Sequence, residues 1–203
     1  MKKIGIFGGT FDPIHTGHIE IAKTAKERMA LDMVVFVPSG DPPHKSLKNA
    51  RNKEDRLTMT ELATSSYDFF SVSDYEIKKN EKSYSVNLIK HFKEVYKEDE
   101  LYFIIGADSL YNLPLWYHYE ELMEMVTFIV LSRPHQLDEK NLLDKFKGTE
   151  KPFRAFFIDD VSIDISATEI RDKIKNGQNV KDILPHHRQK EYFQRFKKRC
   201  FCR

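Results

Sequence analysis

The sequence predicts an α/β protein built on a doubly wound parallel sheet with helices on both faces. Short apolar runs recur along the chain, and between them lie longer segments whose apolar residues repeat at helical spacing. Strands that alternate with helices in this way form βαβ units of one parallel sheet, and right-handed crossovers place the helices on both faces. Residues just after a strand are the first candidates for chemistry, because such folds bind ligands at the carboxyl ends of their strands.

The individual elements follow from the same two patterns. The run 3–7 opens the chain, and Met33–Pro38 is a continuous apolar run ended by proline, as in a strand buried on both faces. A helix is expected over 19–31, where apolar residues recur at helical spacing. Further strands are expected at 70–73, 101–105, 127–131 and 155–158, and further helices at 51–66, 85–96, 120–125, 138–145 and 167–176. This alternation is typical of a Rossmann-like domain.

Composition limits the classes of function. The 203 residues are enough for one domain, 1–203, in which 179–203 is a C-terminal helical extension of two short helices that cover the sheet edge. With 33 basic and 31 acidic residues, the chain lacks the excess of positive charge that is typical of nucleic-acid-binding proteins. Binding of an acidic partner by its basic tail stays an alternative. No apolar run reaches the ~18 residues of a membrane span. Cys200 and Cys202 suit neither a structural disulfide nor a zinc site, so we expect a reduced, cytoplasmic enzyme; its oligomeric state stays open and includes a homo-oligomer.

The most informative stretch is 8–18, Gly-Gly-Thr-Phe-Asp-Pro-Ile-His-Thr-Gly-His, between the first strand and the first helix. Two glycines let the backbone turn tightly and approach a ligand closely. The helix that follows directs its unpaired N–H groups and the positive end of its dipole at the turn, which suits phosphate. His15 and His18 are near enough in sequence to act on one anion. Each part alone fits an ordinary turn with a surface histidine, but their joint occurrence indicates a phosphate site.

Two segments carry a resemblance to a known family. Residues 8–18 resemble the first signature of the nucleotidyltransferase superfamily, and 165–171, Ile-Ser-Ala-Thr-Glu-Ile-Arg, resemble its second. With the motifs below, the whole chain resembles the bacterial nicotinate-nucleotide adenylyltransferase family. The resemblance implies adenylyl transfer from ATP to nicotinate mononucleotide, giving nicotinate adenine dinucleotide and pyrophosphate in NAD biosynthesis. It also implies that His15 and His18 contact the triphosphate and stabilise the reacting phosphorus.

The ATP-binding residues are expected just beyond strands and in the two signatures. They are Gly8, Gly9, Thr10, Phe11, Gly106, Asp108, Arg133, Ile165, Ser166 and Thr168. Asp108 is a natural acceptor for a ribose hydroxyl, or alternatively a helix cap. Arg133 fits a phosphate or base contact as well as an exposed salt bridge. Ser166 with Glu169 is a capping box, and the helix that it opens can hold phosphates together with Arg171.

The acceptor site is expected from three further segments. Lys45 follows Pro-Pro-His in a stiff loop, which by resemblance brings the lysine to the phosphates. By the same resemblance, Ser83, Tyr84 and Ser85 supply backbone N–H groups to the nicotinate carboxylate, although a serine here is also a natural N-cap. The resemblance also implies that Trp116 stacks on the pyridine ring, with Tyr117 contributing its backbone. The alternative for a single Trp is a place in the core.

The expected reaction needs no general base, because the acceptor phosphate, with a second pKa near ~6, is largely a dianion at neutral pH. Catalysis then depends on positioning and charge, and the catalytic residues are His15, His18, Lys45 and Arg171. No aspartate pair indicates a protein-ligated metal, so we expect Mg²⁺ bound mainly through the ATP phosphates. Alternatives are an acceptor that is nicotinamide mononucleotide or phosphopantetheine, and a non-catalytic nucleotide sensor.

Overall fold

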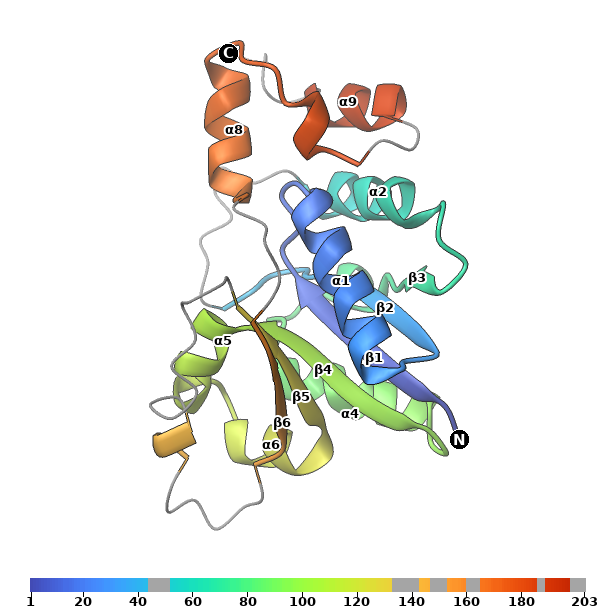
Figure 1. The fold of residues 1–203 in the computed structure, drawn as a ribbon, viewed down its shortest axis with the longest axis vertical. Coiled ribbons are helices and arrows are strands. Elements are labelled where there is room, and N and C mark those ends of the chain that lie inside the picture. The colour runs from blue at the N-terminus through green and yellow to red at the C-terminus, as the bar shows by residue number, and fades with distance from the viewer. Residues whose placement is uncertain (44–51, 133–142, 147–152, 160–164, 186–188, 198–203) are drawn as a thin grey trace. The chain divides into compact units, whose positions relative to one another are not determined.

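The computed structural model describes residues 1–43, 52–132, 143–146, 153–159, 165–185 and 189–197 (Figure 1). The strands are β1 (Lys3–Gly9), β2 (Met33–Pro38), β3 (Phe70–Val72), β4 (Glu100–Gly106), β5 (Thr127–Leu131) and β6 (Ala155–Ile158). The helices are α1 (Thr16–Met29), α2 (Lys53–Thr64), α3 (Tyr75–Lys78), α4 (Ser85–Val95), α5 (Ala107–Tyr111), α6 (Tyr119–Met125), α8 (Ala167–Lys175) and α9 (Gln189–Lys197). Two 3₁₀ turns, η1 (Leu113–Leu115) and η2 (Lys181–Ile183), complete the described elements.

The strands form a six-stranded sheet in the order β3-β2-β1-β4-β5-β6. The pairings of β1 with β4, β4 with β5 and β5 with β6 are parallel, and Lys3 lies opposite Glu100 while Tyr102 lies opposite Thr127. The order reverses between β1 and β4, since the chain first builds outward to β3 and then returns beside β1. This is the strand order of a Rossmann-like fold, and the reversal is where such folds bind nucleotides. The fold class predicted from the sequence is confirmed.

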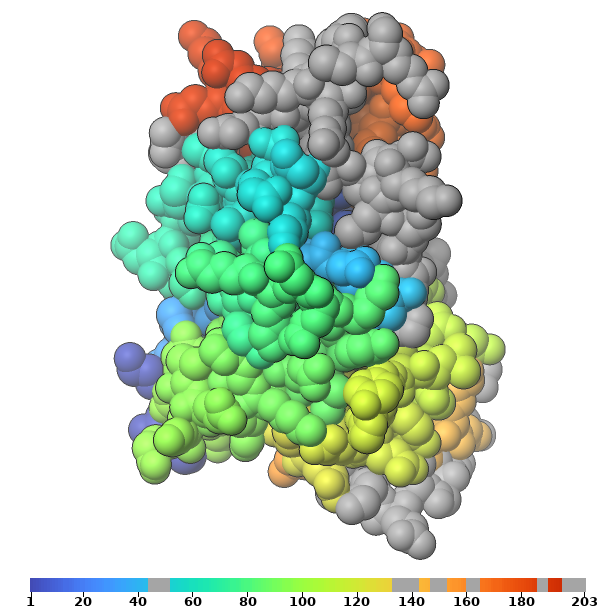
Figure 2. All heavy atoms as spheres, turned by 180° about the vertical axis from the view of Figure 1, so that it is seen from behind, coloured from blue at the N-terminus to red at the C-terminus, as the bar shows by residue number. Residues whose placement is uncertain are grey.

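The chain forms two compact units. The first comprises Met1–Gly8, Ile21–Val34 and Tyr84–Ser162. Its central strand β4 is buried from Leu101 to Ile105, as a parallel strand covered on both faces must be. Figure 1 shows α1 in front of the sheet and α4 behind it. On the face seen in Figure 2, the surfaces of α4 and α6 adjoin.

The second unit comprises Gly9–Glu20, Val35–Ser83 and Ile163–Arg203. Helix α9 packs against α2 (Figure 1), and Tyr192 of α9 is fully buried. The two short helices expected in the tail are therefore present as η2 and α9. The prediction that the tail covers a sheet edge is wrong for its described part, because α9 packs against α2 and buries Tyr192 there.

The remaining differences concern short polar segments. Helix α1 begins at Thr16 and not at Ile19, because its first turn is polar and carries no apolar repeat. The four-residue helix α3 was not predicted, since so short a segment shows no helical period. Most of the helix predicted at 138–145 lies outside the described residues.

Candidate active site

The end of β1 runs into a tight turn that shapes the first motif. Phe11 adopts a left-handed backbone conformation with φ of 48°, which is unusual for a bulky residue, and its side chain is buried. Its ring lies so close to Gly9 that a Cβ at Gly9 would come within 2.8 Å of the Phe11 ring, so a glycine is needed there. The same ring meets the His18 imidazole edge-on, with centroids 5.1 Å apart. A strained aromatic residue therefore fixes the shape of the turn beside the histidines.

His15 and His18 are in ring contact at the start of α1. Their centroids are 3.8 Å apart, and the backbone N–H of His15 donates to Nδ1 of His18 at 3.2 Å. A ring nitrogen that accepts a hydrogen bond carries no proton, so neutral His18 is the Nε2–H tautomer and donates from Nε2. The first turn of α1 contains no acidic residue, so no carboxylate offsets the positive end of the helix dipole there. This arrangement suits an anion.

His15 is a buried histidine whose ring is not fully satisfied. It is 5% exposed, and within the described residues its Nδ1 has no hydrogen-bond partner. Burial lowers the pKa of His15 to about 4, because a charged imidazole loses its hydration there. His15 is therefore neutral at pH 7. A buried polar atom without a partner is uncommon in folded proteins and is a feature of sites that act on a ligand.

The second signature opens α8, and Ser166 caps it as the sequence predicts, since its hydroxyl accepts from the Glu169 N–H at 3.1 Å. Arg171 reaches back to the first motif: one terminal nitrogen donates to the Asp12 carbonyl at 2.6 Å and the other to the Thr168 hydroxyl at 2.9 Å. The fold thus brings the two signatures together within the second unit. Ile165 is half-buried at the entrance of this helix.

The residues predicted for the ATP ribose and the acceptor ring lie in the first unit. Gly106 is the N-cap of α5, so Asp108 stands exposed in the first turn and does not cap this helix. Trp116 is only part-buried, and its ring lies edge-to-face with the Phe103 ring at a centroid distance of 6.5 Å. The rings of Tyr84 and Tyr117 are in contact, 4.6 Å apart, so the two predicted acceptor segments meet. Helix α4 begins at Ser85 without a side-chain cap, which leaves first-turn N–H groups for a ligand.

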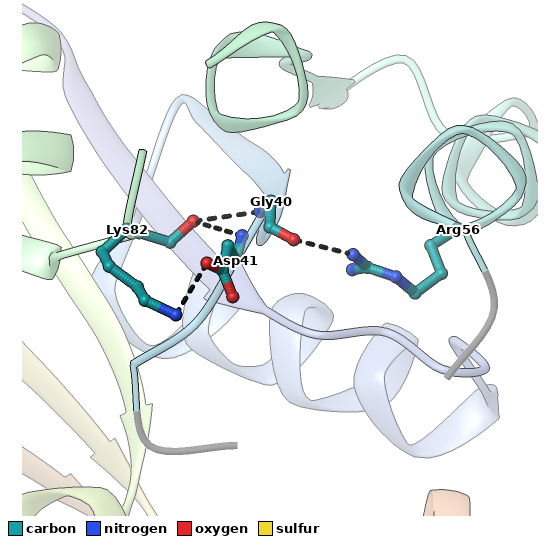
Figure 3. Close-up of polar contacts among 5 residues, drawn as sticks. Gly40, Asp41, Arg56 and Lys82 are labelled. Carbon is teal, nitrogen blue, oxygen red and sulfur yellow. Dashed lines mark hydrogen bonds and ion pairs between the residues drawn. The ribbon is translucent and has the colours of Figure 1, made fainter. Parts of the chain in front are cut away.

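Ser83 is hydrogen-bonded to the loop that follows β2, in which Figure 3 labels Gly40 and Asp41. Its hydroxyl accepts from the N–H groups of Gly40 and Asp41 at 3.0 and 3.1 Å, and its own N–H donates to the Asp41 carbonyl at 2.9 Å. Gly40 must be a glycine here, because a Cβ would lie 2.3 Å from the Glu76 carbonyl oxygen. Lys82 adds an exposed ion pair to Asp41, which contributes little stability. Ser83 therefore anchors the loop, and the backbone donors left for a carboxylate in this segment belong to Tyr84 and Ser85.

Two predicted residues, Lys45 and Arg133, lie outside the described residues. Gly8 and Gly9 form the end of β1, which runs two residues beyond the predicted strand 3–7, so the prediction that they form the turn is wrong. Thr10 and Phe11 lead into the turn. Within the described ranges no cluster of three or more His, Cys, Asp or Glu side chains could hold a metal ion. The same ranges contain no helix long and apolar enough to cross a membrane.

Known proteins are similar in sequence to this chain over most of its length. The family model described as cytidylyltransferase-like matches residues 6–173. The chain belongs to the cytidylyltransferase-like family. Relatives in Clostridium tetani and Clostridium perfringens, each named a probable nicotinate-nucleotide adenylyltransferase, are 44% and 41% identical over 91% of this chain and 93% and 92% of their own lengths. The chain is therefore a nucleotidyltransferase, as its two signatures indicated.

The fold of this nucleotidyltransferase also matches a solved structure. Nicotinic acid mononucleotide adenylyltransferase from Plasmodium falciparum, in complex with NaAD, superposes with a TM-score of 0.79 over 98% of this chain and 97% of its own. The two sequences are 21% identical, so this likeness concerns the fold.

Sequence reasoning missed three buried polar side chains of this nucleotidyltransferase: Arg56, Glu76 and Tyr192. Arg56 donates to the Thr10 carbonyl at 2.7 Å. It also donates to the Gly40 carbonyl at 3.3 Å (Figure 3). One signal was available, because Arg56 stands three and four residues before Met59 and Thr60 on the buried face of α2. A charge at a core position of an amphipathic helix indicates a buried polar contact. Tyr192 and Glu76 gave no comparable signal.

Glu76 makes the stability of the second unit depend on pH. Burial raises the pKa of Glu76 to about 7, although hydrogen bonds from Ser83 and Gly40 and the charges of Lys79 and Arg56 oppose the rise. Because the folded state holds this proton more tightly than the unfolded state, the stability from Glu76 is complete below pH 4.5 and is lost as pH rises through about 7. His15 acts oppositely: its lowered pKa costs stability as pH falls from 6.5 toward about 4.

We therefore expect Glu76→Gln to stabilise the protein relative to wild type by about 2 kcal/mol more at pH 8 than at pH 5. Glutamine keeps the size of the side chain and cannot ionise. Urea unfolding of both proteins at the two pH values measures the difference, and the contribution of His15 cancels in the comparison. An equal difference at pH 5 and pH 8 would contradict the raised pKa.

Proposed function

We propose that the chain transfers the adenylyl group of ATP to nicotinate mononucleotide and releases pyrophosphate. The observation that carries this proposal is the pair His15 and His18 at the start of α1, with Arg171 of the second signature bonded to the same turn. The names of the relatives support nicotinate mononucleotide as the acceptor. The Plasmodium enzyme was solved in complex with NaAD, which is the dinucleotide expected as product.

In the proposed reaction an oxygen of the acceptor phosphate attacks the α-phosphorus of ATP. The bond from that phosphorus to the oxygen bridging to the β-phosphate breaks, and pyrophosphate leaves with the electron pair. The acceptor phosphate is already largely a dianion, so no residue needs to remove a proton. The protein contributes alignment and hydrogen-bond donors directed at the charge that develops.

His18 donates from Nε2 to an oxygen of the reacting phosphate. Neutral His15 lies beside His18, at the positive end of the α1 helix dipole. Arg171 and the first-turn N–H groups of α8 supply positive potential for the β- and γ-phosphates. We propose Lys45 and Arg133 as further phosphate contacts. Magnesium would neutralise phosphate charge, bound mainly through ATP, which fits a metal that keeps few protein ligands.

The acceptor ring is proposed to lie on the part-exposed face of Trp116, beside the paired rings of Tyr84 and Tyr117. Its carboxylate then meets the first-turn N–H groups of α4, where the helix has no side-chain cap. Asp108, exposed in the first turn of α5, is proposed to accept from the ribose of ATP.

The proposal is tested by pyrophosphate release from Mg-ATP with four acceptors: nicotinate mononucleotide, nicotinamide mononucleotide, phosphopantetheine and glycerol 3-phosphate. We expect kcat/KM for nicotinate mononucleotide to exceed each of the others. Nicotinamide mononucleotide gives the most stringent comparison, because it differs from nicotinate mononucleotide only in an amide that replaces the carboxylate. Preference for another acceptor would overturn the assignment of residues 83–117. ATP binding without release from any acceptor would favour a nucleotide sensor.

A further inference from the structure

The turn between β1 and α1 is held by side chains from three distant helices. Arg56 of α2 donates to the Thr10 carbonyl, Arg171 of α8 to the Asp12 carbonyl, and Tyr192 of α9 to the Ile14 carbonyl. Residues 10–14 belong to neither β1 nor α1, so their carbonyls need hydrogen-bond partners other than the backbone of those two elements. No motif or spacing in the sequence connects α9 with this turn.

Tyr192 acts on one particular peptide unit. The Ile14 carbonyl that accepts its hydroxyl belongs to the same planar peptide as the His15 N–H. That N–H is the group that donates to Nδ1 of His18. The phenol, the peptide and the imidazole therefore form one hydrogen-bonded chain, in which a donor at the carbonyl strengthens the N–H as a donor.

We propose that Tyr192 is a positioning residue that, through the Ile14–His15 peptide, fixes the orientation and the Nε2–H tautomer of His18. This inference rests on the proposed function only in assigning His18 to the reacting phosphate. This hydrogen-bonded chain explains why Tyr192 is fully buried in the tail. Its hydroxyl fixes the direction of the Ile14–His15 peptide, whose carbonyl has no backbone partner within the turn.

The surroundings of Tyr192 support a fixed position. Its side chain is 0% exposed, and α9 packs along α2. Nearby, the Thr16 hydroxyl donates to the Ile183 carbonyl at 3.2 Å, which ties the tail to the first turn of α1 a second time. The tail is thus attached at both sides of His15, at Ile14 and at Thr16.

The test is Tyr192→Phe, which keeps the ring and removes the one hydroxyl. We expect kcat to fall about 3- to 30-fold, with both KM values within about 2-fold of wild type, since loss of one positioning hydrogen bond changes the transition state more than substrate binding. Tyr102→Phe is the matched control: its hydroxyl bonds to Glu100 at 3.0 Å in the first unit, and we expect unchanged kcat.

A second readout does not depend on activity. Nitrogen-15 spectra of the His18 ring report its tautomer, with the signals assigned by comparison with His18→Asn. Wild type should show protonated Nε2, and Tyr192→Phe should gain the Nδ1–H form. Unchanged kcat, or a fall in kcat without a change in the His18 spectrum, would overturn the inference. Nδ1–H as the dominant form in wild type would also overturn it. A wild-type protein inactive with every acceptor would refute the proposed function, while the spectra would still decide the role of Tyr192.

Discussion

His18→Asn is expected to lower kcat by about 10²- to 10³-fold, which is the usual cost of losing one donor at developing charge. Asparagine places an oxygen near the position of Nδ1, so the His15 N–H keeps an acceptor while the Nε2–H is lost. The turn should therefore retain its shape, and thermal melting should show little loss of stability. Steady-state kinetics with Mg-ATP and nicotinate mononucleotide measure the effect.

His91→Asn is the matched control for this variant. His91 lies in α4, where its ring contacts Phe92, and it belongs to neither signature. We expect its kcat to match wild type. If His18→Asn kept wild-type turnover, or if it lost activity only because its melting transition disappeared, the assigned role of His18 would be wrong.

Trp116→Ala is expected to raise KM for nicotinate mononucleotide by about 5- to 150-fold, since stacking of a base on an aromatic side chain contributes about 1–3 kcal/mol. KM for ATP should stay near its wild-type value. The indole is suited to this role because its side chain stays part-exposed although its ring contacts Phe103. Initial rates over a grid of both substrate concentrations separate the two constants.

Leu115→Ala provides the comparison within the same loop. Leu115 is 76% exposed and directly precedes Trp116, so its removal takes away apolar surface without removing the ring. We expect both KM values to stay near wild type. Equal effects of Leu115→Ala and Trp116→Ala would point to a general change in the loop and against stacking on the indole.

The parts of the fold that were predicted depend on local pattern. Three strands were predicted with the ends that the structure has, because each is a short apolar run that ends at proline or before a polar residue: Met33–Pro38, Thr127–Leu131 and Ala155–Ile158. The Ser166 cap was predicted for the same kind of reason, since a capping box lies within four consecutive residues. The turn at 8–18 also carries its own signals, two glycines and a histidine pair.

The parts that were missed depend on contacts between distant segments. Tyr192 contacts Ile14 across 178 positions of the sequence, and nothing in the tail marks that residue among its other aromatic residues. Ser83 looked like a helix cap, yet it bonds to Gly40 and Asp41, because the loop after β2 folds back onto it. The backbone conformation of Phe11 likewise follows from packing of its ring against Gly9 and His18, which no local propensity predicts.

The central claim is that the chain joins the α-phosphate of ATP to nicotinate mononucleotide. Its most direct test is a reaction of these two substrates with ATP labelled with ³²P at the α-phosphate, followed by separation of the products. The account predicts that the label appears in nicotinate adenine dinucleotide and that unlabelled pyrophosphate forms in equal amount. Label found in AMP or ADP, with no labelled dinucleotide, would contradict the account.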